Sequence, residues 1–137
     1  MKKTGPLFIQ EQEIPWEQWE DEATNEVSPI LWKTLITSDR LASTNITLGI
    51  TAIPVGAVEL KHSHPAPEAY YFLEGLGIVH IDGAAYPVKS GSALFIPGNA
   101  EHMVTNTGEE TLRFVYVFPL DRWRESAYTF SEERSDH

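Results

Sequence analysis

Residues 56–75, GAVELKHSHPAPEAYYFLEG, decide the fold and the site of this chain. On a β-strand alternate residues share a face, so His62 and His64 point the same way. After a short proline-containing link, Glu68 and Tyr70 are again two residues apart on one face. The stretch therefore predicts two imidazoles and one carboxylate aimed at a common point from adjacent strands.

A second stretch, residues 91–106 (GSALFIPGNAEHMVTN), supplies a third imidazole. His102 follows the turn at Pro97–Asn99 and opens a later strand. Three histidines and one glutamate suit a divalent ion of intermediate softness, and they leave one or two positions for water or substrate. We expect Fe²⁺ first, with Mn²⁺, Ni²⁺, Co²⁺ and Zn²⁺ as alternatives. Because the chain has no cysteine, thiolate ligands, disulfides and a thiol nucleophile are excluded.

From Leu41 onward, short β-branched and aromatic runs alternate with turn residues, which is typical of an antiparallel barrel or sandwich. Asp82-Gly83 is a tight hairpin signal. No helix-length amphipathic period interrupts this region, so the prediction is an all-β fold. The expected strands are Thr44–Ile53, Val58–His62, Ala69–Leu73, Gly77–Ile81, Ala85–Val88, Ala93–Ile96, His102–Asn106 and Leu112–Phe118.

The N-terminal part has a mixed pattern. Pro15–Ala23 (PWEQWEDEA) predicts a short helix, with Trp16 and Trp19 on one face packing against the barrel or a partner subunit. Leu31–Thr37 is the expected first strand. We expect the chain to consist of an N-terminal segment over residues 1–40, a β-barrel over 41–130 and a flexible tail over 131–137.

The charge and hydrophobicity of the chain limit the classes of binding partner that we expect. The net charge is −10, from 20 acidic and 10 basic side chains, and no basic run is long enough to follow a phosphate backbone. Nucleic acid is therefore a poor candidate partner. No window approaches the roughly 18 apolar residues that a membrane span needs, and the first ten residues lack a signal-peptide pattern. We expect a cytoplasmic protein without a membrane partner.

The spacing of these residues resembles the two motifs of the cupin superfamily. The first, G-x5-H-x-H-x3-E-x6-G, is matched at every position, and the second, G-x5-P-x-G-x2-H-x3-N, departs only where Asn99 replaces glycine. Asparagine tolerates the left-handed conformation well, so the turn should survive. The resemblance implies a jelly-roll-like barrel (a double-stranded β-helix) with a short N-terminal helix. The matching positions are Gly56, His62, His64, Glu68, Gly75, Gly91, Pro97, His102 and Asn106.

Beyond the ligands, the chain is similar to the small single-cupin dimethylsulfoniopropionate lyases, from about Leu31 to Phe130. These bacterial enzymes split a zwitterion into dimethyl sulfide and acrylate. They carry a tyrosine two residues after the metal-binding glutamate, and Tyr70 occupies that place. A second tyrosine near their C-terminus is matched by Tyr128. The similarity is densest in HSHPAPEAY (62–70), PGNAEH (97–102) and TLRFVYVFPLDRWRESAY (111–128).

For such a reaction the resemblance implies a division of roles. A metal on the substrate carboxylate stabilises the charge that develops as the α-proton leaves, and Tyr70 acts as the base, with Tyr128 as a second catalytic residue. The permanently positive sulfonium favours aromatic faces. Trp32 and Tyr116 are the expected substrate-binding residues, with Tyr128 beside them.

Two other readings use the same four ligands. One is an Fe²⁺ dioxygenase or a sugar or keto-acid isomerase, and the other is a non-catalytic metal-dependent cupin that binds a small molecule. All of them take a small-molecule ligand, a carboxylate in the lyase case. A homodimer is also expected, because Trp16 and Trp19 suit an interface between N-terminal segments.

Overall fold

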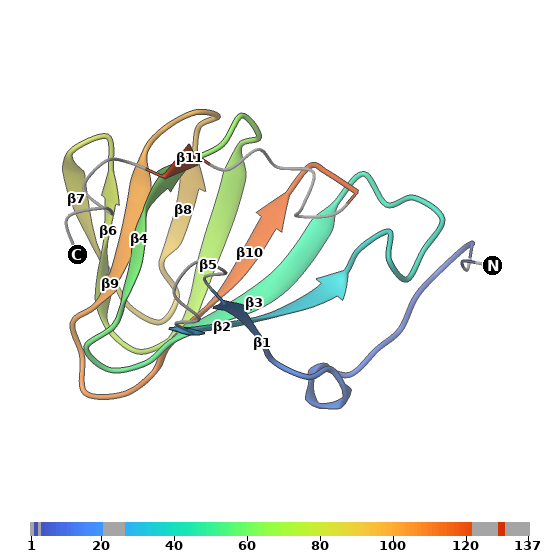
Figure 1. The fold of residues 1–137 in the computed structure, drawn as a ribbon, viewed down its shortest axis with the longest axis horizontal. Coiled ribbons are helices and arrows are strands. Elements are labelled where there is room, and N and C mark those ends of the chain that lie inside the picture. The colour runs from blue at the N-terminus through green and yellow to red at the C-terminus, as the bar shows by residue number, and fades with distance from the viewer. Residues whose placement is uncertain (1, 3, 21–26, 122–128, 131–137) are drawn as a thin grey trace.

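The computed structural model describes every residue except 1, 3, 21–26, 122–128 and 131–137. Its described strands form two antiparallel sheets that curve around a common interior (Figure 1). The six-stranded sheet runs β1 (Glu17–Glu20), β2 (Val27–Ile36), β3 (Thr47–Ile53), β10 (Leu112–Phe118), β5 (Glu68–Glu74) and β8 (Ala93–Ile96). The five-stranded sheet runs β11 (Thr129–Phe130), β4 (Val58–Ser63), β9 (His102–Asn106), β6 (Gly77–Ile81) and β7 (Ala84–Val88).

The all-β prediction is confirmed. Every predicted strand has a counterpart within a few residues, and the hairpin at Asp82-Gly83 joins β6 to β7. Both turn residues have positive φ, 46° and 86°, as a two-residue hairpin of the type that follows strand twist requires. In the part of the chain that the structure describes, no helix has the length and apolar character to cross a membrane.

The predicted helix over Pro15–Ala23 is wrong. Glu17–Glu20 is strand β1, and the described N-terminal part is helical only in a short 3-10 turn, η1 (Glu11–Glu13). The reason is pairing: Glu17 lies opposite Trp32, so β1 extends the edge of the six-stranded sheet. Trp16 lies under the ammonium group of Lys33, 4.4 Å from the ring centroid, so this tryptophan does pack on the sheet.

The core lies between the two sheets and comes from alternate strand positions. On β10 every second residue from Leu112 to Phe118 is buried, and on β5 Glu68, Tyr70 and Phe72 are the buried positions. Rings dominate the middle, with Phe114 4.8 Å from Phe72 between centroids. Along β5 the interior thus changes from a polar ligand candidate to apolar rings.

The turn before β9 fixes the relation between the two sequence motifs. Asn99 has φ of 67°, so asparagine does adopt the left-handed conformation expected of it. Its N–H donates to the carbonyl of His64 at 2.7 Å. A side chain at Gly98 would collide with the carbonyl oxygen of Pro65, so glycine permits this close approach. The turn therefore holds the start of β9 against the end of β4.

Asn106 ties the other end of β9 to its neighbours. Its buried amide donates to the carbonyls of Ile53 and Glu110, each at 2.9 Å, and its Oδ1 accepts from the N–H of Gly108 at 2.9 Å. The motif asparagine is thus a structural clamp between β3, β9 and the turn that leads into β10.

We predict that Asn106→Ala lowers the free energy of unfolding by about 3 kcal/mol, because it leaves buried backbone groups without partners. Urea denaturation measures this, with the exposed neighbour Thr107→Ala as the control, expected to change stability by less than about 0.5 kcal/mol. Equal effects of the two substitutions would contradict the clamp.

Candidate metal centre

Four polar side chains meet at one end of the interior. His62 lies near the end of β4, His64 just after it, and Glu68 and His102 are the first residues of β5 and β9. His62 and His102 are direct partners across the β4–β9 ladder, so their side chains point to the same face. All four residues are buried, with exposed fractions of 6% or less.

The imidazoles are close enough to share one ion. The candidate ligand atoms of His62, His64 and His102 all lie within 4.8 Å of one another. The ring of His62 is 4.2 Å from that of His102 and 6.0 Å from that of His64, measured between centroids. A single atom between the three rings would be within reach of each.

The second nitrogen of each ring is already engaged. Nδ1 of His62 bonds the carbonyl of Leu60 at 2.7 Å, and Nδ1 of His64 bonds that of Ala66 at 2.8 Å. Nδ1 of His102 likewise bonds the carbonyl of Ala100 at 2.9 Å. A carbonyl can only accept, so each Nδ1 carries a proton, and Nε2 is the atom of each ring that remains to bind a metal.

Glu68 completes the cluster. Its Oε1 is 3.2 Å from Nε2 of His64 and 3.5 Å from Nε2 of His102. The 3.5 Å contact lacks hydrogen-bond geometry, so the buried Nε2 of His102 has no hydrogen-bond partner among the described residues. An orphaned ring nitrogen that faces a carboxylate is what a site built for a cation would show.

Burial and neighbouring charge shift the titration of these groups. Burial lowers the pKa of His62 to about 4, so this ring stays neutral. Burial alone would raise the pKa of Glu68, but its contacts with His102 and His64 outweigh this and lower it. Burial alone would lower the pKa of His102, and the contact with Glu68 reverses the sign. These shifts favour an ionised Glu68 and a neutral His62, two of the ligand forms that a divalent ion needs.

Tyr70 lies one inward position deeper than Glu68 on β5 and is 3% exposed. Its ring is 4.5 Å from that of Phe114 and 6.3 Å from that of His102, centroid to centroid. The predicted catalytic tyrosine therefore borders the histidine cluster on one side and the aromatic core on the other.

The other predicted residues have different surroundings. Tyr116 pairs with Tyr70 across the β10–β5 ladder, but its hydroxyl is hydrogen-bonded to that of Thr34 at 3.1 Å, and burial raises its pKa. Trp32, on β2, is partly buried against the core. Tyr128 falls outside the described residues. The substrate-binding and second catalytic roles of these three residues stay predictions.

Glu59 is a residue that the sequence reasoning missed. It lies on β4 opposite Val104, an interior residue, and it interacts with His102, Glu68 and Tyr70. Strict alternation from His62 would place Glu59 on the outer face, three positions away. A register shift between the two residues brings both inward, and nothing in the sequence pattern marks that shift.

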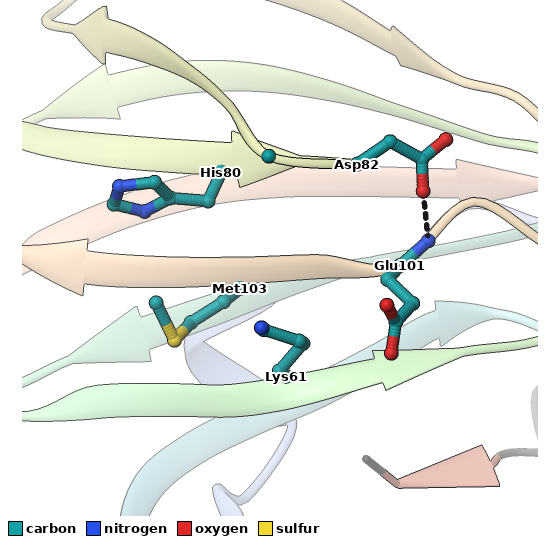
Figure 2. A pocket seen from close by; sticks show the side chains of 6 residues that line it. Lys61, His80, Asp82, Glu101 and Met103 are labelled. Carbon is teal, nitrogen blue, oxygen red and sulfur yellow. Dashed lines mark hydrogen bonds between the residues drawn. The ribbon is translucent and has the colours of Figure 1, made fainter. Parts of the chain in front are cut away.

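His80 lies apart from this cluster. It lines a pocket on the outer face of the five-stranded sheet with Lys61, Glu101 and Met103 (Figure 2). Its neighbour Val79 is fully buried on the opposite face. At the edge of this pocket Oδ1 of Asp82 accepts the backbone N–H of Glu101 at 2.9 Å, the bond drawn in Figure 2. The outer pocket is separate from the four converging ligands.

Comparison with known proteins agrees with the geometry. The Cupin domain family model matches residues 49–118, which include all four ligand candidates. The dimethylsulfoniopropionate lyase DddW of Ruegeria pomeroyi is 38% identical over 126 residues, 92% of this chain and 80% of that protein. The oxalate-binding protein of Thermotoga maritima is 35% identical, over 50% of this chain and 57% of its own length.

Solved structures match in fold. A predicted oxalate decarboxylase from Thermotoga maritima superposes with a TM-score of 0.67 at 24% identity, covering 83% of this chain and 99% of that one. The oxalate decarboxylase of Bacillus subtilis, whose Mn(II) centres have been studied, gives 0.66 at 23% identity over 77% of this chain and 29% of its own. With half of its length matched by the family model and a barrel of this shape, the chain belongs to the cupin domain family.

Proposed function

We propose that this cupin is a metal-dependent lyase that cleaves dimethylsulfoniopropionate, or a similar small carboxylate, into dimethyl sulfide and acrylate. The observation that carries the proposal is the convergence of three imidazoles and a carboxylate with a buried tyrosine directly beneath them. The relationship to the lyase of Ruegeria pomeroyi supports the choice of substrate.

His62, His64, Glu68 and His102 would hold the ion, through three Nε2 atoms and a carboxylate oxygen. When bound, a divalent ion supplies positive charge that favours the substrate carboxylate and an ionised Tyr70. First-row ions share such ligands, so Fe²⁺ remains the first expectation, with Mn²⁺, Ni²⁺, Co²⁺ and Zn²⁺ as alternatives.

Tyr70 would perform the proton transfer. Its phenolate oxygen takes the proton from the carbon next to the substrate carboxylate, and the electron pair of that C–H bond becomes the new C=C bond. The bond between the β-carbon and sulfur breaks, and sulfur keeps its pair and leaves as dimethyl sulfide. No electron is gained or lost overall, which separates this reaction from a dioxygenase.

The sulfonium end of the substrate needs a surface that tolerates positive charge without competing as a base. Aromatic faces meet this need. Trp32, Tyr116 and Tyr128 are our candidates, and for Tyr116 the contribution would come from the ring because its hydroxyl is bonded to Thr34. The expected homodimer, cytoplasmic location and lack of nucleic-acid or membrane partners also remain predictions.

The first prediction concerns the metal. Protein purified without a nickel column should contain close to one first-row divalent ion per chain, and chelation should lower its melting temperature, since an ion that binds only the folded state stabilises it. His102→Ala should lose the ion, whereas His80→Ala, on the outer face, should keep it. Elemental analysis checks both, and metal retention by the His102 variant would contradict the site.

The second prediction concerns the substrate. Metal-loaded protein given dimethylsulfoniopropionate should release dimethyl sulfide and acrylate in equal amounts without consuming oxygen. Gas chromatography of the headspace and an oxygen electrode measure this. Release no greater than that of the His102→Ala protein would refute the proposed substrate, and oxygen uptake would favour the dioxygenase.

The third prediction isolates the base. Tyr70→Phe should keep the fold and the metal but lose at least about 100-fold in kcat, because general-base catalysis contributes about that much or more. The adjacent Tyr71, half exposed on the opposite face, gives the matched control Tyr71→Phe, whose kcat should be unchanged. Full activity in Tyr70→Phe would remove this residue from the mechanism.

A further inference from the structure

The side chain of Tyr116 on β10 leans across β3 and reaches β2. The three strands are neighbours in the six-stranded sheet, and Gly49 on β3 lies between Tyr116 on one side and Thr34 on the other. The phenol oxygen is 3.1 Å from Oγ1 of Thr34 and 3.4 Å from the carbonyl oxygen of Lys33. Both contacts belong to β2, so the hydroxyl of Tyr116 lies on the far side of β3 from its own strand.

Gly49 makes this crossing possible. It lies within β3 and has no positive φ, so its backbone conformation does not require glycine. A Cβ atom at this position would overlap the phenol oxygen of Tyr116 and the ring carbon that carries it, as well as the carbonyl oxygen of Lys33. Glycine inside a strand weakens the strand and marks a place where another group approaches closely. Here that group is the end of the phenol.

The direction of the hydroxyl decides what Tyr116 offers to the candidate site. Tyr116 lies opposite Tyr70 across the β10–β5 ladder, so the two side chains share the inner face of the sheet. The ring of Tyr70 is in turn 6.3 Å from that of His102, centroid to centroid. Because β5 and β2 lie on opposite sides of β10, a hydroxyl held at β2 is turned away from Tyr70. Tyr116 therefore offers its neighbour ring carbon and no hydrogen-bonding group.

We propose that Gly49 and Thr34 are positioning residues that hold Tyr116 in this orientation, so that the site selects substrates whose cationic end carries no hydrogen-bond donor. The selectivity rests on the proposed function above. An aromatic ring attracts a methylated onium group, which has no N–H or O–H to donate. A hydroxyl turned inward would instead favour an ammonium group, which has three N–H donors. A dimethylsulfonium group fits the first kind of wall.

Thr34→Val tests the role of the hydroxyl partner, because it removes the hydroxyl and keeps the shape of a buried side chain. We expect KM for dimethylsulfoniopropionate to rise about 3- to 10-fold, the value of one hydrogen bond, with kcat changed by less than about 2-fold. Thr34→Ser keeps the hydroxyl and should restore KM. Thr51→Val, a buried threonine opposite Phe114 on the same strand as Gly49, is the matched control and should leave KM unchanged. An unchanged KM in Thr34→Val, or a fall in kcat alone, would overturn the proposal.

Two probes measure the selectivity without turnover. β-Alanine and its trimethylated form, β-alanine betaine, have the same carboxylate and the same cationic charge, but only β-alanine has N–H donors. Calorimetry with the metal-loaded protein should show the betaine binding at least about 10-fold more tightly, and Thr34→Val should narrow this ratio. The same ratio in the wild type and in Thr34→Val would contradict the selection by Tyr116.

Denaturation tests the two contacts without any ligand. In metal-free protein, the urea unfolding free energies of Thr34→Val, Tyr116→Phe and the double variant should be non-additive, because the two hydroxyls are direct partners. Gly49→Ala should cost less stability in the Tyr116→Leu background than in the wild type, because leucine has no phenol end to overlap. Additive values for the hydroxyl pair would overturn the role of Thr34. Equal losses from Gly49→Ala in both backgrounds, or failure to fold in both, would overturn that of Gly49.

The experiments fail in different ways for this proposal and for the lyase. If the wild type releases no dimethyl sulfide, the proposed reaction is wrong, and the two probes still decide whether the site selects a methylated cation. If the wild type is active and Thr34→Val behaves like Thr51→Val, the reaction stands and the positioning role fails.

Discussion

Three short hydrogen bonds from histidine Nδ1 atoms to backbone carbonyls set the orientation of the site. Each carbonyl belongs to a residue two positions from its histidine, so the direction of every ring is fixed by the local path of the chain. The two histidine segments are then joined to each other by the bond from Asn99 to the carbonyl of His64. Convergence of the Nε2 atoms follows from these backbone contacts and does not depend on flexible side chains.

Because alternate residues of a strand share a face, each strand places side chains of different chemical character at successive depths of the interior. On β5 the inward positions are Glu68, Tyr70 and Phe72, which pass from a charged ligand to a phenol to a purely apolar ring. On β9 His102 is followed at the next inward position by Val104. Because the carboxylate and the phenol come from the same strand, their separation is fixed by the pleat. A tyrosine two residues after a metal-ligating glutamate is therefore placed one layer beneath the ion by geometry alone.

The sequence predicted most strands and the ligand cluster, because both depend on short-range spacing. Gly77–Ile81, Ala93–Ile96 and His102–Asn106 have the predicted bounds. The helix over 15–23 failed because pairing of Glu17–Glu20 with β2, a contact distant in sequence, overrode the local helical preference. The inward position of Glu59 was not predicted, again because it depends on a contact distant in sequence. A bulge is defined by the register of two strands, and the sequence of β4 alone does not indicate it.

The same bulge explains how one strand can serve both the ligand layer and the layer below it. A regular β4 would offer the interior His62 and Leu60, so that apolar surface would face the phenol. The extra residue substitutes a partly buried carboxylate, whose Oε1 is withdrawn from water, at that depth. Positive charge nearby, from His102 in the metal-free protein or from a bound cation, reduces the cost of that withdrawal. The bulge in β4 and the position of Glu59 are therefore linked. The bulge turns the carboxyl group inward, and positive charge at the site lowers the free-energy cost of keeping it there.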